Sequence, residues 1–305
     1  MASTPARPLP PAGDATHAFR LGGTLTVNRV GLGAMRLPSD GWHGRARDAA
    51  TGRAVLRRAV ELGVNHIDTA DFYRSGDGAL RANALIREAL HPYPAALVIA
   101  TKVGPVFGPR GPSPAPPAGL RALVEANLKS LGLERLDLVY LRIGVMTVPH
   151  RESLAERFEA LAALREEGLI RHLGLSNVDA GHLTEARAIA PVAAVQNHFH
   201  VAEQDEATVL DACAANGIAF VPFGPLGSGD TDLNEARLAR VARRHDATVS
   251  QIALAWLLAL SPVTLAIPGT GSLVHLEENI AAGSIALSLD DLADLGTTGS
   301  VHTRS

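Results

Sequence analysis

The sequence predicts a single (β/α)₈ barrel, and three observations support that fold class. The chain has 305 residues, and one such barrel typically takes about 250. Short runs rich in Val, Ile and Leu recur without clean polar alternation, as in strands buried on both faces. Helical segments separate these runs, and eight such units favour a closed barrel over an open doubly wound sheet.

The strand and helix segments follow one another in a regular order. Phe19 to Val27, with two glycines at its centre, is expected to form a β-hairpin that closes the barrel bottom. Strands are expected at residues 29–33, 64–68, 97–102, 136–141, 170–175, 192–196, 218–223 and 263–267. Helices are expected at residues 49–62, 120–131, 154–167, 207–216, 234–245 and 249–260. The first four of these helices end beside a glycine, which is a common C-terminal cap.

The remaining segments are expected to be irregular. The first 18 residues are rich in Pro, Ala and Thr and lack the apolar core of a secretion signal. They are interpreted as a flexible tail, and residues 19–305 as one domain. The Pro- and Gly-rich stretch 104–119 is expected to be a long loop, which is usually functional or disordered.

Composition excludes several classes of protein. The net charge of −3 and the 4% aromatic content argue against a nucleic-acid partner. No run of about 18 apolar residues is present, so no membrane partner is expected. The one cysteine, Cys213, rules out an intramolecular disulfide and fits a reducing, cytoplasmic setting. A small-molecule substrate and a monomer or weak homo-oligomer are expected.

In such a barrel, chemistry takes place at the C-terminal ends of the strands. The residues predicted there combine one acid, two cations, amide and hydroxyl groups and an aromatic ring: Gly33, Asp68, Lys102, Arg142, Ser176, Gln196, Phe223 and Gly269.

Asp68, Tyr73 and Lys102 form a candidate proton-transfer group. Reducing a carbonyl needs a hydride and a proton, and a free tyrosine, with a pKa of about 10, is a poor acid at neutrality. A nearby cation stabilises a tyrosinate, and Asp68 can hold the Lys102 ammonium as an ion-pair partner. Taken singly, these residues can also be a helix cap, a solvated charge and a core aromatic.

Several segments together resemble one family. Residues 62–73, which read LGVNHIDTADFY, strongly resemble the signature of the aldo-keto reductases. The motifs GLGAMR at 31–36, ATKV at 100–103, GLSN at 174–177, VQN at 195–197 and IPGT at 267–270 resemble further family segments. The resemblance extends from about residue 19 to residue 295 and touches nearly every strand end.

The resemblance implies a (β/α)₈ barrel that binds NADP(H) in an extended form, without a glycine-rich Rossmann turn. It gives Asp68, Tyr73 and Lys102 the catalytic roles. It implies that Ser176, Asn177 and Gln196 hold the nicotinamide carboxamide and that Phe223 stacks on the ring. The remaining cofactor contacts implied are Gly33, Ala34, Met35, Gly224, Leu226, Gly227, Ser228, Gly269, Thr270, Gly271, His275, Glu278 and Asn279.

Two positions depart from the family pattern. The fourth catalytic residue is usually a histidine, whereas Arg142 stands here. Arginine stays protonated and cannot shuttle a proton, but it can polarise a carbonyl oxygen or hold an anionic part of a substrate. It can also simply pair with a loop carboxylate. Relatives place Lys or Arg near residues 270–275 for the 2′-phosphate, and no strong cation stands there in this chain. NADP is favoured, with NAD not excluded.

The combination of Arg142 with the flanking motifs resembles the pyridoxal reductase branch of the family. The leading hypothesis is a reductase of an aldehyde or ketone, possibly pyridoxal. The alternatives are reduction of a sugar or polyketide intermediate, and a nicotinamide-binding regulatory subunit.

Two other pairs of side chains also stand out. His198 and His200 alternate just past a strand, but no carboxylate pattern accompanies them, so a pocket wall is favoured and no metal is expected. Trp42 and His43 either line the substrate pocket or form a rim patch.

Overall fold

The computed structural model describes residues 18–108, 111–144, 148, 152–227 and 236–296. The expected N-terminal tail lies outside this range, apart from Ala18, which begins the first strand. Ser228 also lies outside the described residues.

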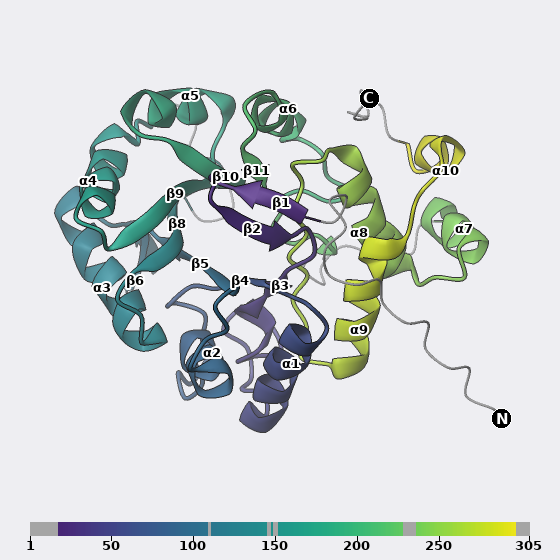
Figure 1. The fold of residues 1–305 in the computed structure, drawn as a ribbon, viewed down its shortest axis with the longest axis horizontal. Helices are drawn as coiled ribbons and strands as arrows, with labels where there is room; N and C mark the ends of the chain where they lie inside the picture. The colour runs from purple at the N-terminus through teal and green to yellow at the C-terminus, as the bar shows by residue number, and fades with distance from the viewer. Residues whose placement is uncertain (1–17, 109–110, 145–147, 149–151, 228–235, 297–305) are drawn as a thin grey trace.

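Seven parallel strands curl into a barrel within the described residues (Figure 1). Neighbouring strands follow the order β3 (Leu32–Gly33), β4 (His66–Asp68), β5 (Val98–Val103), β8 (Leu136–Arg142), β9 (Ile170–Ser176), β10 (Val192–Gln196) and β11 (Ala219–Phe220). These strands confirm the parallel order that the buried apolar runs predict.

The eighth expected run, 263–267, closes the barrel without counting as a regular strand. Thr264 forms a parallel bridge with Phe220 of β11, and Ala266 forms one with Val30 beside β3. Backbone N–H groups of Leu265 and Gly31 donate across the two seams at 2.8 Å each. The chain is therefore a closed (β/α)₈ barrel, in which this segment is joined by single bridges rather than by a continuous ladder.

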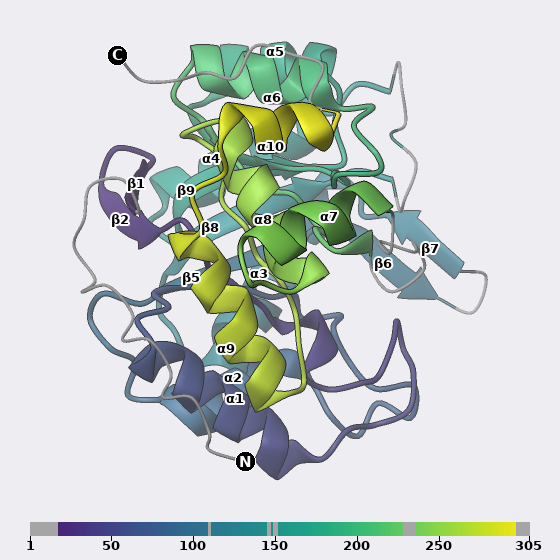
Figure 2. The same cartoon turned by 90° about the vertical axis from the view of Figure 1, so that its right-hand side faces the viewer.

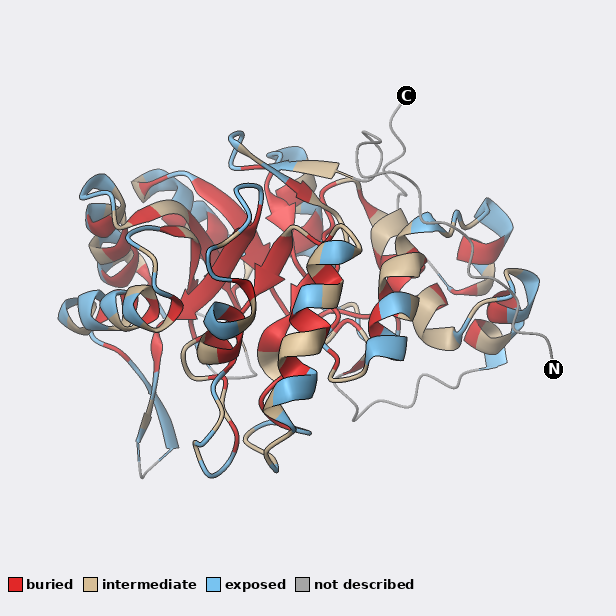
Figure 3. Cartoon of the chain, turned by 60° about the horizontal axis from the view of Figure 1, so that its bottom comes forward, coloured by how far each residue is buried: buried red, intermediate tan, exposed pale blue. Residues whose placement is uncertain are grey.

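Helices surround the barrel and present their apolar faces to the strands (Figures 1 and 3). They are α1 (Ala49–Glu61), α2 (Ala82–Leu90), α3 (Leu120–Leu131), α4 (Ala155–Glu166), α5 (Ala180–Ile189), α6 (Ala207–Ala215), α7 (Ala236–Arg244), α8 (Val249–Leu260), α9 (Leu273–Ala281) and α10 (Leu289–Asp294). Gly132 ends α3 in the left-handed conformation at φ 69°, as a C-capping glycine should.

Two antiparallel hairpins stand at opposite ends of the barrel (Figure 2). The first joins β1 (Ala18–Leu21) to β2 (Leu25–Asn28), as predicted, and its side chains Leu21 and Val27 are fully buried in the barrel core. Its turn uses Gly22 at φ 54°, where a side chain would also collide with His172.

The second hairpin corrects the expectation that residues 104–119 form only a long loop. β6 (Pro105–Gly108) pairs with β7 (Gly111–Pro114) in that stretch. The sequence concealed the hairpin because proline is disfavoured in strands, and both strands of this isolated pair are edges, where it is tolerated.

No helix in the described parts of the chain is both long and apolar enough to cross a membrane.

Candidate active site

The strand register brings the predicted residues to one edge of the barrel. Gly33 pairs with Asp68 across β3 and β4. On the other side of the barrel, Ser176 pairs with both Arg142 and Gln196. Because all of these strands are parallel, their C-terminal ends meet at one mouth.

Asp68 and Lys102 form a buried ion pair beneath Tyr73. Lys102 Nζ donates to Asp68 Oδ1 at 2.5 Å and to the Thr69 carbonyl oxygen at 3.1 Å. The two charged side chains are 2% and 3% exposed. The ammonium also lies 4.8 Å from the centre of the Tyr73 ring. The structure thus brings the acid, the lysine and the tyrosine into one group.

The charge on Lys102 is secure despite its burial. Burial alone would lower its pKa, but the attraction of Asp68 and Tyr73 outweighs burial and leaves the pKa above its ordinary value. Lys102 is therefore a permanent cation near neutral pH, as support for a tyrosine proton donor requires.

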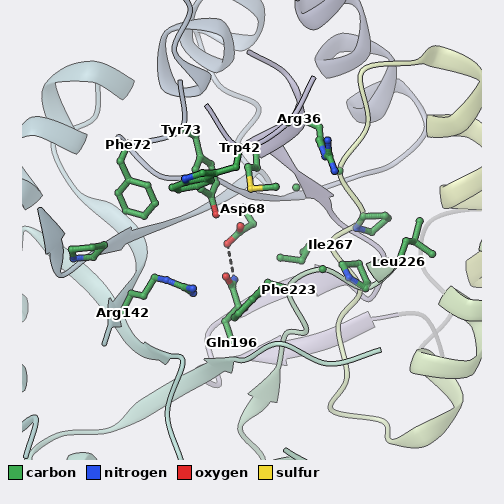
Figure 4. A pocket seen from close by; sticks show the side chains of 18 of the residues that line it. Arg36, Trp42, Asp68, Phe72, Tyr73, Arg142, Gln196, Phe223, Leu226 and Ile267 are labelled. Carbon is green, nitrogen blue, oxygen red and sulfur yellow. Dashed lines mark hydrogen bonds between the residues drawn. The ribbon is translucent and has the colours of Figure 1, made fainter. Parts of the chain in front are cut away.

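Arg142 lies across the mouth from Tyr73 (Figure 4). Its guanidinium donates from Nη1 to Ser176 Oγ at 2.9 Å and stacks 4.7 Å from the Phe223 ring centre. Burial lowers the pKa of Arg142, and the nearby Tyr73 and Asp68 oppose that shift. An arginine remains protonated under these conditions. The fixed cation therefore borders the place where Tyr73 would meet a carbonyl.

Gln196 offers a test of whether this site fits a nicotinamide. Its Nε2 donates to Asp68 Oδ2 at 2.8 Å, which leaves Oε1 buried and without a hydrogen-bond partner in the structure. Because Gln196 lines the cavity, its amide can exchange hydrogen bonds with the carboxamide of a nicotinamide. Phe223 beside it provides an aromatic face. The residues present therefore fit the cofactor that the sequence implies.

A cavity of about 780 Å³ opens above these residues. It is large enough for part of a dinucleotide and a small substrate. Ten of the predicted site residues line it: Gly33, Met35, Asp68, Tyr73, Arg142, Gln196, Phe223, Gly224, Leu226 and Gly269.

Other predicted residues lie behind or beyond the cavity wall. Ala34, Ser176 and Asn177 are buried. Asn177 donates to the Ile143 carbonyl oxygen at 2.9 Å. Gly227 follows the lining residue Leu226. Beyond Gly269, the chain continues past the cavity rim to α9 through the residues expected near the adenosine: Thr270, Gly271, His275, Glu278 and Asn279.

Aromatic side chains wall the outer part of the cavity. Trp42 stacks on His43 at 4.5 Å between ring centres and meets the Tyr73 ring edge-on at 6.2 Å. Phe107 of β6 lies 5.8 Å from Trp42 and 5.2 Å from Phe72. The structure thus answers the open question about Trp42: it lines the pocket. Phe72 and Phe107 are pocket residues that sequence reasoning missed.

The two histidines past β10 have a carboxylate partner, which corrects the sequence interpretation. Glu203 Oε1 lies 2.9 Å from His198 Nδ1. Glu203 is brought back by a turn, and its place could not be inferred from spacing. His200 Nδ1 accepts the Ala202 N–H at 3.2 Å, so a neutral ring carries its proton on Nε2, which lies 3.8 Å from Glu203 Oε2. His198 packs 5.4 Å from Phe223 and so supports the pocket wall.

Comparisons with known proteins agree with this geometry. The family model described as "Aldo/keto reductase family" matches residues 29–297. Pyridoxine 4-dehydrogenase of Escherichia coli is 45% identical over 92% of this chain and 97% of its own length. An uncharacterised oxidoreductase of Schizosaccharomyces pombe is 41% identical over 91% of this chain and 88% of its own.

Solved structures show the same fold. The thermostable aldo-keto reductase Tm1743 superposes with a TM-score of 0.77 at 29% identity, covering 92% of this chain and 99% of that one. An aldo/keto reductase from Klebsiella pneumoniae, in complex with NADP and acetate, gives 0.75 at 27% identity over 92% and 94%. The chain therefore belongs to the aldo/keto reductase family, the NADP(H)-dependent oxidoreductases that interconvert carbonyl compounds and alcohols.

Proposed function

We propose that this enzyme interconverts pyridoxal and pyridoxine. The proposal rests above all on Arg142, a half-buried cation held by Ser176 and Phe223 at the edge of an aromatic cavity. The 45% identity to a pyridoxine 4-dehydrogenase over nearly the whole chain supports the same substrate.

The chemistry of pyridoxal matches these surroundings. Its ring carries an acidic hydroxyl beside the aldehyde, so one cation can hold the ionised oxygen and the carbonyl oxygen on the same side. A guanidinium offers several donors in one plane and suits such a pair of oxygens. The aromatic faces of Trp42 and Phe107 suit a flat heterocycle.

Tyr73 is the proposed proton donor. NADPH, when bound, supplies the hydride to the carbonyl carbon. The Tyr73 hydroxyl gives its proton to the carbonyl oxygen, and the Lys102 ammonium, held by Asp68, stabilises the tyrosinate that remains. Arg142 cannot exchange protons and acts by orienting and polarising the substrate. Solvent at the open mouth returns the proton to Tyr73.

The test compares pyridoxal with pyridine-4-carboxaldehyde, which lacks the ring hydroxyl, with NADPH and NADH run in parallel. We expect wild-type enzyme to prefer pyridoxal in kcat/KM. Arg142→Met should reduce kcat/KM for pyridoxal by about 100-fold and for the simpler aldehyde much less, since the hydrogen bond to an ionised ring oxygen exists only with the former. Arg142→Lys, which keeps the charge, is the matched control and should retain part of the preference.

Other outcomes would redirect the proposal. Turnover of sugar or polyketide-like carbonyls without turnover of pyridoxal would favour a reductase of secondary metabolism. Tight NADPH binding with no turnover of any carbonyl in the panel would favour a regulatory subunit. An equal fall in kcat/KM for both aldehydes in Arg142→Met would show that Arg142 does not recognise the ring hydroxyl of the substrate.

We propose a cytoplasmic monomer or weak homo-oligomer. Cys213 is a buried free thiol whose pKa burial raises to about 12, so it is unreactive and fits a reducing compartment. Gel filtration of this 31.9-kDa chain tests the oligomeric state, and cell fractionation tests the location.

A further inference from the structure

The adenosine end of the cofactor site contains a cation that comes from a distant part of the chain. Arg47 lies in the loop between β3 and α1, more than 200 residues before Gly271 in the sequence. A methyl group added to Gly271 would lie 2.9 Å from Arg47 Nη1 and 3.0 Å from its Cδ and Cζ. The guanidinium thus lies directly against the segment where relatives carry their own cations.

The loop holds Arg47 in this position. Its backbone N–H donates to the Pro38 carbonyl oxygen at 3.0 Å, and its side-chain Nε donates to the Ser39 carbonyl oxygen at 3.0 Å. A bridge between Ser39 and Ala46 closes the same loop. With Nε anchored, the edge of the side chain formed by Cδ, Cζ and Nη1 lies against Gly271.

The charge of Arg47 has no protein counter-ion among the described residues. No Asp or Glu in that part of the chain pairs with it. Arg58 of α1 differs in this respect, although it also reaches α9. Its Nε lies 2.9 Å from Glu277 Oε1 and its Nη1 lies 3.3 Å from Glu61 Oε2, so carboxylates neutralise its charge. An arginine fixed by its loop yet lacking a carboxylate is suited to an anionic ligand.

The groups around Gly271 fit a phosphate. Ser272 caps α9, whose first turn contains no acidic residue. The first N–H groups of a helix lack acceptors within it and favour anions. Gly271 carries no side chain that would separate the guanidinium from a ligand on this segment. Ile267, Pro268 and Gly269 line the cavity immediately before it, so the site continues the cofactor path.

We propose that Arg47 holds the adenosine 2′-phosphate of NADP(H), in place of the cations that the sequence lacks at residues 270–275. Arg47, on the β3–α1 loop, would then supply the positive charge that is missing at residues 270–275. Thr270, Ser272 and His275 contribute hydroxyl or imidazole groups, and the arginine supplies the permanent charge that distinguishes NADP(H) from NAD(H).

The test is cofactor binding, measured by calorimetry with NADP⁺ and NAD⁺ in the absence of substrate. Arg47→Gln should raise the Kd for NADP⁺ by about 10- to 100-fold, as expected when a charged hydrogen bond is lost, and change that for NAD⁺ less than about 2-fold. Arg47→Lys should recover part of the NADP⁺ affinity. Arg58→Gln removes the same charge near the same helix and should leave both affinities unchanged.

A second variant guards against a folding defect in Arg47→Gln. Gly271→Ala leaves Arg47 in the chain but forces its guanidinium away, so it should weaken NADP⁺ binding more than NAD⁺ binding. The affinity of wild-type enzyme for 2′-AMP should exceed that for 5′-AMP and fall with added salt. Unchanged NADP⁺ affinity in Arg47→Gln, or equal weakening of both cofactors in the two variants, would overturn the proposal.

Discussion

Single residues set the chemistry of this barrel through buried charge. Lys102 is almost fully enclosed, so its charge persists only because Asp68 compensates it. Asp68 in turn receives the Gln196 amide, which connects the acid to the expected nicotinamide pocket. Removing one partner of such a pair leaves an uncompensated buried charge and costs about 3–5 kcal/mol. In the group of Asp68, Lys102 and Tyr73, Tyr73 can be tested with the smallest change, because a substitution by phenylalanine removes only its hydroxyl.

Tyr73→Phe should lower kcat for carbonyl reduction by about 100- to 10,000-fold, the usual contribution of a general acid. The aromatic ring that contacts Lys102 and Trp42 remains, so the site should keep its shape. NADPH affinity, measured by fluorescence titration, should stay within about 2-fold of wild type, since the hydroxyl is needed for proton transfer. Retained turnover would eliminate the proton-donor role.

The strand-end residues could be predicted, whereas the loop residues could not. Asp68, Lys102, Arg142 and Gln196 follow buried runs whose ends must meet in a closed barrel. Arg47 and Phe107 lie on loops, and their positions depend on contacts made only after folding. Sequence spacing carries no information on such contacts.

At the scale of elements, the β6–β7 hairpin forms part of the substrate wall. Phe107 projects from it onto Trp42, His43 and Phe72. The hairpin protrudes from the body of the barrel at the end opposite β1 and β2 (Figure 2). Its aromatic contacts therefore join an outlying element to the pocket.

Phe107→Ala should raise KM for aromatic aldehydes by about 10-fold and leave kcat nearly unchanged, since one aromatic contact is worth about 1 kcal/mol and lies away from Tyr73. The melting temperature should change little, because the side chain is only partly buried. Steady-state kinetics and thermal melts check both points. Val106→Ala, on the exposed neighbour, is the matched control. A large fall in kcat would place Phe107 nearer the chemistry.

Helices and strands were predicted correctly where the local sequence pattern decides how a segment packs. α3 and α8 begin and end at the predicted residues. Several strands are shorter than their apolar runs, since β3 keeps two residues and β11 two. The predicted apolar runs are longer than the observed strands because residues beyond the last hydrogen bond of the sheet are still buried under the helices. α2, α5 and α10 were not foreseen, and α2 begins at Ala82, shortly after Tyr73.

At the scale of the whole molecule, His66 links barrel stability to pH. Its ring is buried in the barrel, and neither nitrogen has a hydrogen-bond partner in the structure. Burial lowers its pKa from 6.5 to about 4. Between these values the unfolded chain binds a proton that the folded barrel does not. Stability contributed by neutral His66 is therefore present above pH 6.5 and lost as the pH falls toward 4.

Urea unfolding at pH 7 and pH 4.5 measures this loss. Wild-type enzyme should lose stability at the lower pH, with His66 responsible for up to about 3 kcal/mol. His66→Met, of similar volume and without a titrating group, should lose correspondingly less. Equal losses in the two proteins would mean that His66 has an ordinary pKa in the barrel.

The hairpin of β1 and β2 leaves only one end of the barrel through which molecules can enter and leave. Leu21 and Val27 of this hairpin are buried in the barrel core and close its floor. Cofactor and substrate therefore enter and leave through the mouth at the opposite end. Gln196 is fully buried there, whereas half of Trp42 is exposed at the rim. A dinucleotide and an aldehyde would therefore share one entrance, and whichever of them lies deeper can leave only after the outer one has gone.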